Sequence, residues 1–316
     1  AFRLRQNESV GKGIRRIVGE QIDKAIAELH DPALDRHQAI HQVRKRCKRI
    51  RGAIRLVRPQ FEAVYRQENA CFRDAARTLS PIRDAEAIIA TYDALLDAFA
   101  GQVDRRTFGG VRRALTLRRK RIIQEQTDLE ARLEEFIVTL RQARERVDGW
   151  PLPKDGFAAV AGGLKKTYGR GRRALELAYA KPSSARFHEW RKRVKYLRYH
   201  LRLLGGLWEP VMKTAWSEVK ALSDLLGDDH DLAVFRQTLT DDPKAFGDAK
   251  VLQALLGLID RRRAQLQQQA RPLGLRVFAE KPAALARRLD GYWEAWQLES
   301  RRPAPALAEA AVPPGQ

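Results

Sequence analysis

Two short segments of the chain are dense in basic side chains of the kind that bind anions. Residues 41–51 read HQVRKRCKRIR, and residues 188–198 read HEWRKRVKYLR. Arginine can hold two phosphate oxygens at once, and lysine supplies a compact, mobile positive charge. The first segment contains no acid that would neutralise these charges. This combination predicts binding of a densely charged anion, with recognition of phosphate groups alone.

Each segment has the spacing of an amphipathic helix. At 100° per residue one face of each helix is apolar and faces a core, and an adjacent face is cationic. Like charges three or four positions apart destabilise an isolated helix, so a face selected for stability alone would include acids. A solvated basic face is the alternative, and the all-basic face in both copies argues against it. The cationic faces comprise His41, Arg44, Lys45, Lys48, Arg51 and Arg55, and His188, Arg191, Lys192, Lys195, Arg198 and Arg202.

The elements that position these faces are predicted to be helices throughout. Residues that favour helices dominate, and alternating strand patterns bounded by tight turns are nearly absent. The predicted helices span 8–30, 33–57, 60–79, 84–99, 104–147, 157–180, 184–204, 208–226, 230–239, 249–269 and 280–298. The segment 148–156, DGWPLPKDG, is the expected linker, and the Pro/Ala-rich tail 303–316 is expected to be disordered.

The two halves of the chain, 8–147 and 157–300, repeat one pattern. His41 and His188 lie 147 positions apart, and so do Asp84 and Asp231. A repeat of this length is too long for a solenoid of short units. It predicts two similar helical units related by a pseudo-twofold axis. Such an axis would bring the two cationic faces together around a basic groove.

The overall charge agrees with an anionic partner. The 316 residues include 60 Lys and Arg against 39 Asp and Glu, for a net charge of +21. The candidates are therefore nucleic acid, an acidic membrane surface and polymeric phosphate. No apolar run is long enough to span a membrane, no apolar leader is visible, and no zinc motif is present. Cys47 and Cys71 suit a reducing compartment, and Cys47 falls on the apolar seam of its helix.

At these residues the sequence resembles the CHAD family, the conserved histidine α-helical domain. That family carries two His-x-x-Arg blocks rich in Lys and Arg, each followed by a Leu-Gly or Leu-Ser motif that ends in Asp. Here the blocks are HQVRKRCKRIRGAIRL and HEWRKRVKYLRYHLRLL, followed by LSPIRDAEAI and LGDDHDLAVF. The match extends over about 8–300, a single domain made of two repeats. His230 departs from the pattern, because many relatives have Asn or Arg there.

The resemblance implies an all-α fold of two four-helix-type bundles, with pseudo-twofold symmetry, around a basic central cavity. It implies binding of inorganic polyphosphate without catalysis and without a cofactor. It also implies a cytoplasmic protein on polyphosphate granules, with polyphosphate-metabolising enzymes or granule proteins as partners. The carried-over residues are those of the two cationic faces without Arg55 and Arg202. Second-rank contacts are expected at Arg15, Arg16, Arg73, Lys165, Lys166 and Lys220.

Several alternatives stay open on the residues alone. The first is a nucleic-acid-binding protein that contacts the phosphate backbone, and the second is a polyphosphate-processing enzyme. Asp84 and Asp231 could then be catalytic, although a helix cap or a support for a basic side chain is the expected role. A metal ion at His41 and His188 would be repelled by the surrounding cations. The runs 112–121 and 168–173 are either solvated surface or extensions of the basic path.

Overall fold

The computed structural model describes residues 1–125 and 128–300, without the side chains of 80–83 and 300. The prediction of an all-helical chain is confirmed, since the described residues contain no strand. The first half contributes α1 (Val10–His30), α2 (Arg36–Leu56), α3 (Glu62–Thr78), α4 (Ser80–Ala98), α5 (Gly109–Gln124) and α6 (Leu129–Val147). The second contributes α7 (Ala158–Ala180), α8 (Ser184–Leu203), α9 (Glu209–Asp241), α10 (Ala249–Val277) and α11 (Pro282–Ser300). Three short 3-10 helices, η1 (Arg58–Gln60), η2 (Arg105–Phe108) and η3 (Pro243–Phe246), lie between them.

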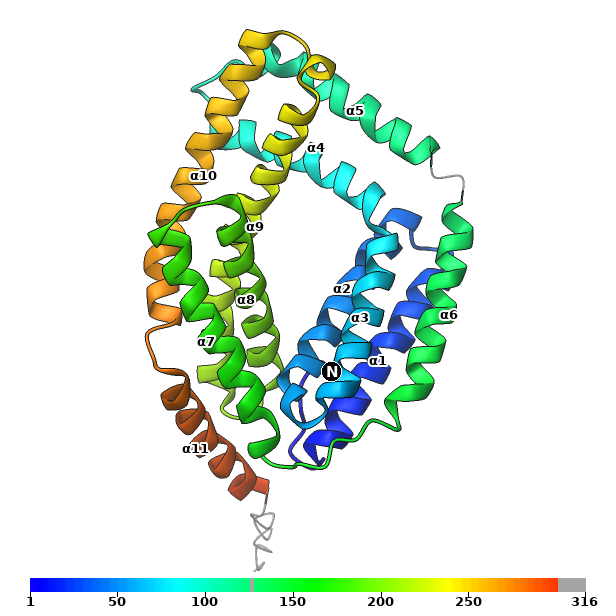
Figure 1. Ribbon diagram of the computed structural model, residues 1–316, viewed down its shortest axis with the longest axis vertical. Coiled ribbons are helices and arrows are strands. Elements are labelled where there is room, and N and C mark those ends of the chain that lie inside the picture. Colours follow the sequence, from blue (N-terminus) through cyan, green and yellow to red (C-terminus); the bar gives the residue numbers. More distant parts are fainter. Residues whose placement is uncertain (126–127, 301–316) are drawn as a thin grey trace, which may run out of the picture.

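The helices form two groups joined by a distal lobe (Figure 1). Helices α1, α2, α3 and α6 lie on one side, and α7, α8, α11 and the near parts of α9 and α10 lie on the other. Helices α4 and α5 meet the far parts of α9 and α10 at one end. The expected linker is irregular chain between α6 and α7. The pseudo-twofold relation between the groups stays a prediction, and the predicted tail lies outside the described residues.

The buried core does not divide at the boundary between the repeats. The larger core includes Ile17 of α1, Ile50 of α2, Val194 of α8 and Leu222 of α9, all fully shielded from solvent. The second core fills the distal lobe with residues of α4 and α5 from the first half and of α9 and α10 from the second. Because both cores draw on both repeats, neither half encloses its own hydrophobic interior.

One predicted helix is two helices in the structure. The prediction placed a single helix over 104–147, but α5 ends at Gln124 and α6 begins at Leu129. The residues 124–128, QEQTD, contain no apolar side chain that could anchor a continuous helix to a core. Val111 and Leu115 of α5 pack in the distal core, whereas α6 packs in the larger one. A single straight helix over these residues could not pack against both cores.

Two other helices run past their predicted ends. The predicted break between 226 and 230 is absent, because α9 is continuous from Glu209 to Asp241. Gly227 is tolerated there, and buried Asp229 anchors α9 to α10 by accepting hydrogen bonds from Arg263 (3.0 Å) and Gln267 (2.8 Å). Likewise, α10 continues past residue 269 through Pro272. Tertiary packing therefore overrides the local signals that indicated helix ends.

In the first half the corresponding helix is interrupted. Shifted by 147 positions, α3 and α4 fall on 209–245, which is nearly the span of the single helix α9. The break is at Leu79, just before Ser80 and Pro81. Proline lacks a backbone N–H and clashes with the carbonyl four residues earlier, so it favours the first turn of a new helix. This break directs α4 away from the larger core toward the distal lobe (Figure 1).

Candidate functional site: a cationic centre between the two repeats

The two cationic helices α2 and α8 contact each other, although they are far apart in the sequence. Gly52 of α2 lies at this contact, where a Cβ atom would approach the Tyr199 side chain to 2.8 Å. A glycine at this position lets the two backbones approach closely. Because their apolar seams are buried in the larger core, the contact brings parts of the two cationic faces near each other.

Lys48 and Lys195 lie in the middle of this arrangement. Both side chains are partly buried, and neither makes a hydrogen bond or an ion pair with any described side chain. Burial, followed by the positive charges of Arg44 and Arg191, lowers the pKa of Lys48 to about 8. Burial, followed by the charges of Arg191, Lys48 and Arg198, lowers the pKa of Lys195 to about 7. We call Arg44, Lys48, Arg191, Lys195 and Arg198 the central cationic site.

The two arginines of the repeated motif are held in the same way in both halves. Arg44 Nη2 lies 3.6 Å from Asp84 Oδ1, and Arg191 Nη2 lies 3.9 Å from Asp231 Oδ1. The two arginine side chains are only 14% and 16% exposed. Both aspartates lie inside helices rather than at N-caps, so of the two expected roles the geometry fits the support of a basic side chain.

Arg191 keeps unused hydrogen-bonding capacity. Its Nε is buried and has no hydrogen-bond partner among the described residues. Burial also lowers the pKa of this guanidinium. A buried donor without an acceptor carries a desolvation cost, which a bound anion would relieve. The aspartates near the site are fewer than its cations, so a positive excess remains.

The two motif histidines are in different surroundings. His188 Nδ1 lies 3.1 Å from His230 Nδ1, and the two rings are 4.4 Å apart between centroids. Burial lowers the pKa of both rings, to about 3 for His230, so the pair is neutral near pH 7. His41 is half-buried on α2, and the position that matches His230 in the first half is Arg83. The two repeats therefore differ at this point of the site.

The far ends of the cationic faces are held by neutral and aromatic neighbours. Arg51 Nε donates to Asn69 Oδ1 at 3.1 Å, and the guanidinium of Arg55 lies 4.0 Å from the centre of the Tyr196 ring. In the second half Arg198 Nη1 lies 3.8 Å from Asp224. Apart from this last contact these partners leave the positive charge intact, since an amide or a ring orients a guanidinium without neutralising it.

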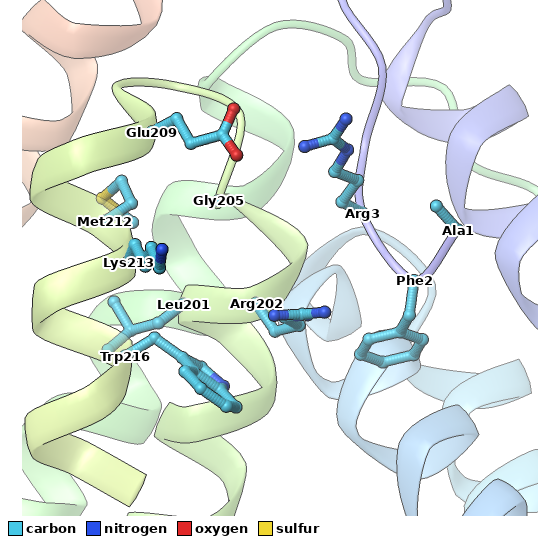
Figure 2. Close-up of a pocket in the computed structure, with 10 residues that line it drawn as sticks. All are labelled: Ala1, Phe2, Arg3, Leu201, Arg202, Gly205, Glu209, Met212, Lys213 and Trp216. Atoms are coloured by element: carbon cyan, nitrogen blue, oxygen red, sulfur yellow. The ribbon is translucent and has the colours of Figure 1, made fainter.

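Arg202 lines a separate pocket with a volume of about 340 Å³ (Figure 2). Arg3 from the N-terminal segment and Lys213 from α9 also line this pocket, together with one acid, Glu209. The Arg202 guanidinium lies 5.2 Å from the centre of the Trp216 ring. Sequence reasoning missed Arg3 and Lys213, because they lie outside the repeated motif. The pocket extends positive charge beyond the end of α8.

Most of the second-rank residues are engaged elsewhere. Arg15 donates to the Trp150 carbonyl at 2.6 Å, and Arg16 pairs with Glu8 at 2.6 Å and with Glu20 at 2.8 Å. Exposed cations with a carboxylate partner are Arg73 with Asp74 (2.8 Å), Lys220 with Asp224 (2.6 Å) and Lys192 with Glu189 (2.5 Å). Lys45, Lys165 and Lys166 are exposed. The structure therefore separates the central lysines from these outer ones.

A second group of guanidiniums lies where α7 approaches η1 and α2. Burial, followed by the charges of Arg193, Arg58 and Arg55, lowers the pKa of Arg170. Arg193 and Arg58 each pair with a glutamate, but Arg55 Nε is buried without an acceptor. The run YGRGRR at 168–173 was the available signal for Arg170. The run at 112–121 lies on α5 in the distal lobe, away from α2 (Figure 1).

Neither a metal centre nor a membrane span was found in the described part of the chain. Within 1–125 and 128–300 no group of three His, Cys, Asp or Glu side chains is placed to hold a metal ion. No helix in these ranges is both long and apolar enough to cross a bilayer. Cys47 is fully buried in the core, and burial raises the pKa of its thiol to about 12.

Comparison with known proteins identifies the family. A family model, the CHAD domain, matches residues 16–240. The chain belongs to the CHAD family. The CHAD domain is associated in general with polyphosphate binding. Two uncharacterized proteins of Mycobacterium tuberculosis, from strains CDC 1551 and H37Rv, are each 26% identical over 294 residues. The alignment covers 88% of the chain but 53% of each relative, so the chain spans about half their length.

Proposed function

We propose that the central cationic site binds inorganic polyphosphate and that binding involves no catalysis. The observation that carries this proposal is the pair Lys48 and Lys195, one from each repeat, partly buried among arginines without a carboxylate partner. Burying like charges together is unfavourable unless a ligand supplies the counter-charge. Phosphate oxygens supply it, and they also accept from the unpartnered Arg191 Nε.

A polymer fits the arrangement better than a single phosphate. The cationic face of α8 runs from His188 to Arg202, which at 1.5 Å per residue is about 20 Å. It continues into the pocket beside Trp216, where Arg3 and Lys213 add further cations. A chain that places one charge every few ångströms can contact all of these groups at once. Affinity should therefore rise with phosphate chain length.

The same chemistry suggests where the protein acts. As a binding module it would act in the cytoplasm, on polyphosphate granules, beside polyphosphate-metabolising enzymes or other granule proteins. Absence of catalysis is part of the proposal. The two motif aspartates contact Arg44 and Arg191, and a carboxylate held by a guanidinium is a poor ligand for the Mg²⁺ that phosphoryl transfer uses.

Single-stranded nucleic acid is the second candidate. Its support is the set of aromatic rings beside the cations, Tyr65 and Tyr196 near Arg55 and Trp216 near Arg202. Bases stack on such rings in many single-strand binders. Here, however, guanidinium groups already lie near these rings. Polyphosphate, which needs no stacking surface, is therefore favoured.

The test of the proposal is a calorimetric titration of long-chain polyphosphate into the wild-type protein and two charge-reversed variants. Lys48→Glu with Lys195→Glu should weaken binding at least about tenfold, since phosphate contacts dominate this affinity. The matched control, Lys244→Glu with Lys250→Glu, makes the same charge change at exposed positions of the distal lobe. Equal affinity of both variants, with helicity unchanged, would contradict a central binding site.

A further inference from the structure

The lysines of α8 differ in their surroundings. The Lys192 side chain is 44% exposed, and its ammonium forms an ion pair with Glu189 at 2.5 Å. Lys195 is partly buried and has no carboxylate within ion-pair distance among the described side chains. Arg191 and Arg198 lie on the same face of α8, four positions before it and three after it, and Lys48 lies on α2, which contacts α8. The charges of these three residues disfavour the ammonium of Lys195, and Asp231 of α9 favours it.

These surroundings favour the neutral amine of Lys195. Desolvation and neighbouring cations both penalise an ammonium, as the depressed pKa of this residue records. A neutral lysine amine is a nucleophile, which the protonated form is not. The arginines that disfavour the ammonium are also donors for phosphate oxygens. An unoccupied site therefore presents a nucleophile next to a phosphate-binding group.

We propose that Lys195 is a site of acylation by acyl phosphates, and that acylation switches off the central cationic site. The proposal rests on the proposed function, because the same arginines would bind the phosphate of the reagent. Arg191, with its buried and unpartnered Nε, and Arg198 would donate hydrogen bonds to the phosphate oxygens. Lys195 is four positions after Arg191 and three before Arg198 on the same face of α8, so a reagent held by these arginines would present its acyl carbon to the amine.

The reaction balances without a further reactant. The lone pair of Lys195 Nζ attacks the acyl carbonyl carbon, and a nitrogen–carbon bond forms. The bond between that carbon and the phosphate oxygen breaks, and its electron pair leaves with orthophosphate. The amine loses one proton to solvent. The product is a neutral amide, which can no longer be protonated to a cation and which adds bulk at the centre of the site.

Occupancy and acylation should exclude each other. Bound polyphosphate supplies negative charge that raises the pKa of Lys195, so the occupied site holds an unreactive ammonium. It also fills the space that an acyl phosphate needs. Conversely, an acylated Lys195 cannot contact phosphate as a cation, and its acyl group would add bulk beside Arg191 and Arg198. Free acyl phosphate would therefore compete with polyphosphate for the site and would leave Lys195 covalently acylated.

The experiment treats the 316-residue protein with acetyl phosphate at pH 7 and follows each lysine by peptide mass spectrometry. Lys195 should be acetylated at least about tenfold faster than Lys192 and Lys220, which are paired with Glu189 and Asp224, with Lys48 between them. The lowered pKa values of Lys195 and Lys48 increase their fractions of free amine at pH 7. Polyphosphate should protect Lys195 and leave the exposed lysines unaffected. Loss of polyphosphate affinity should track the acetylated fraction of Lys195.

Two further measurements test whether phosphate binding directs the reaction to Lys195. An acetylating N-hydroxysuccinimide ester, which carries no phosphate, should show a smaller preference for Lys195, and added orthophosphate should slow only the acetyl phosphate reaction. Equal labelling of Lys195 and Lys192 by acetyl phosphate would overturn the proposal, even if polyphosphate binds as expected. Fast labelling of Lys195 that polyphosphate cannot prevent would uphold a reactive lysine but contradict polyphosphate binding at this site.

Discussion

Lys48 and Lys195 show at the scale of single residues how the site works. Lys45 and Lys192 lie on the same predicted cationic faces, yet they are solvent-exposed or paired with an acid. The sequence pattern predicted all four as equivalent members of two faces. Lys48 and Lys195 differ from Lys45 and Lys192 because of the way α2 and α8 pack against each other. The spacing of residues along the sequence does not show how two helices pack.

Binding of polyphosphate should take up protons near neutral pH. In the free protein Lys195 and Lys48 titrate at about 7 and about 8, and a bound polyanion raises both pKa values. Affinity should therefore decrease as the pH rises from 7 to 9. Titration calorimetry in two buffers of different ionisation enthalpy measures the uptake directly. Identical heats in both buffers at pH 7.5 would mean that these lysines do not titrate on binding.

Replacing Lys195 by an apolar residue should stabilise the protein while it weakens binding. Because the folded-state pKa is lowered to about 7 from 10.5, the unfolded chain binds more protons between these values, so stability rises with pH in that window. Lys195→Met removes this penalty. The expected rise in Tm is about 2–4 °C at pH 6.5, vanishing toward pH 10.

The control for this measurement is Lys165→Met, which removes an exposed lysine from α7. It should change Tm little at either pH, since surface substitutions are generally mild. If Lys195→Met lowers Tm at pH 6.5, the lysine is not a buried, uncompensated charge.

At the scale of elements, the close approach of α2 to α7 and α8 determines how the residues of the central cationic site are positioned. Gly163 of α7 lies against the backbone of α2, where an added Cβ would be 1.9 Å from the Leu56 carbonyl oxygen. Together with Gly52 against α8, this contact brings α7, α2 and α8 together. A backbone atom cannot move aside as a side chain can, so the glycine is required by packing and not by its φ angle.

Substitutions of two helical glycines should therefore have opposite effects. Gly163→Ala forces α7 away from α2 and should reduce the free energy of unfolding by about 3 kcal/mol. Gly227→Ala, in the middle of α9 with open space around its Cβ position, should increase it by about 0.5–1 kcal/mol. Urea denaturation of both variants measures the difference. A Gly163→Ala variant as stable as wild type would show that the helices are not in contact here.

Helix identity was predictable from periodicity, but several helix ends were not. Pro81 lies in the first turn of α4, as the ordinary rule for proline predicts, and the predicted start at 84 was close to the observed start at Ser80. Gly227 and Pro272 carry the same kind of signal, yet α9 and α10 continue through them. Buried contacts such as Asp229 with Arg263 hold those helices together, and such contacts are invisible before the fold is known.

At the scale of the whole molecule, the net charge of +21 is divided between a central site and peripheral surfaces. The distal lobe carries its own basic helix, α5, whose exposed cations include Arg113 and Lys120. Composition predicted an anionic partner but could not say which basic segment binds it. The sequence repeat indicated the answer, because only α2 and α8 carry the repeated motif.

The salt dependence of polyphosphate affinity distinguishes binding at the central cationic site from binding at the basic surface of α5. The logarithm of the dissociation constant for polyphosphate should rise linearly with the logarithm of salt concentration, because binding releases counterions. Lys48→Met should reduce this slope by about 1, as expected for the loss of one phosphate contact. Arg113→Gln with Lys120→Gln on α5 should leave the slope unchanged. The opposite pattern would place the polyanion on the distal lobe.

The most direct test of the account is a competition between two polyanions at about 150 mM salt, where weak surface attraction is screened. Long-chain polyphosphate and single-stranded RNA of equal total charge are titrated against each other by calorimetry. We expect polyphosphate to bind at least about tenfold more tightly than the RNA, a difference of about 1.4 kcal/mol. If RNA binds as tightly or more tightly, the central cationic site is a nucleic-acid surface and the proposed function is wrong.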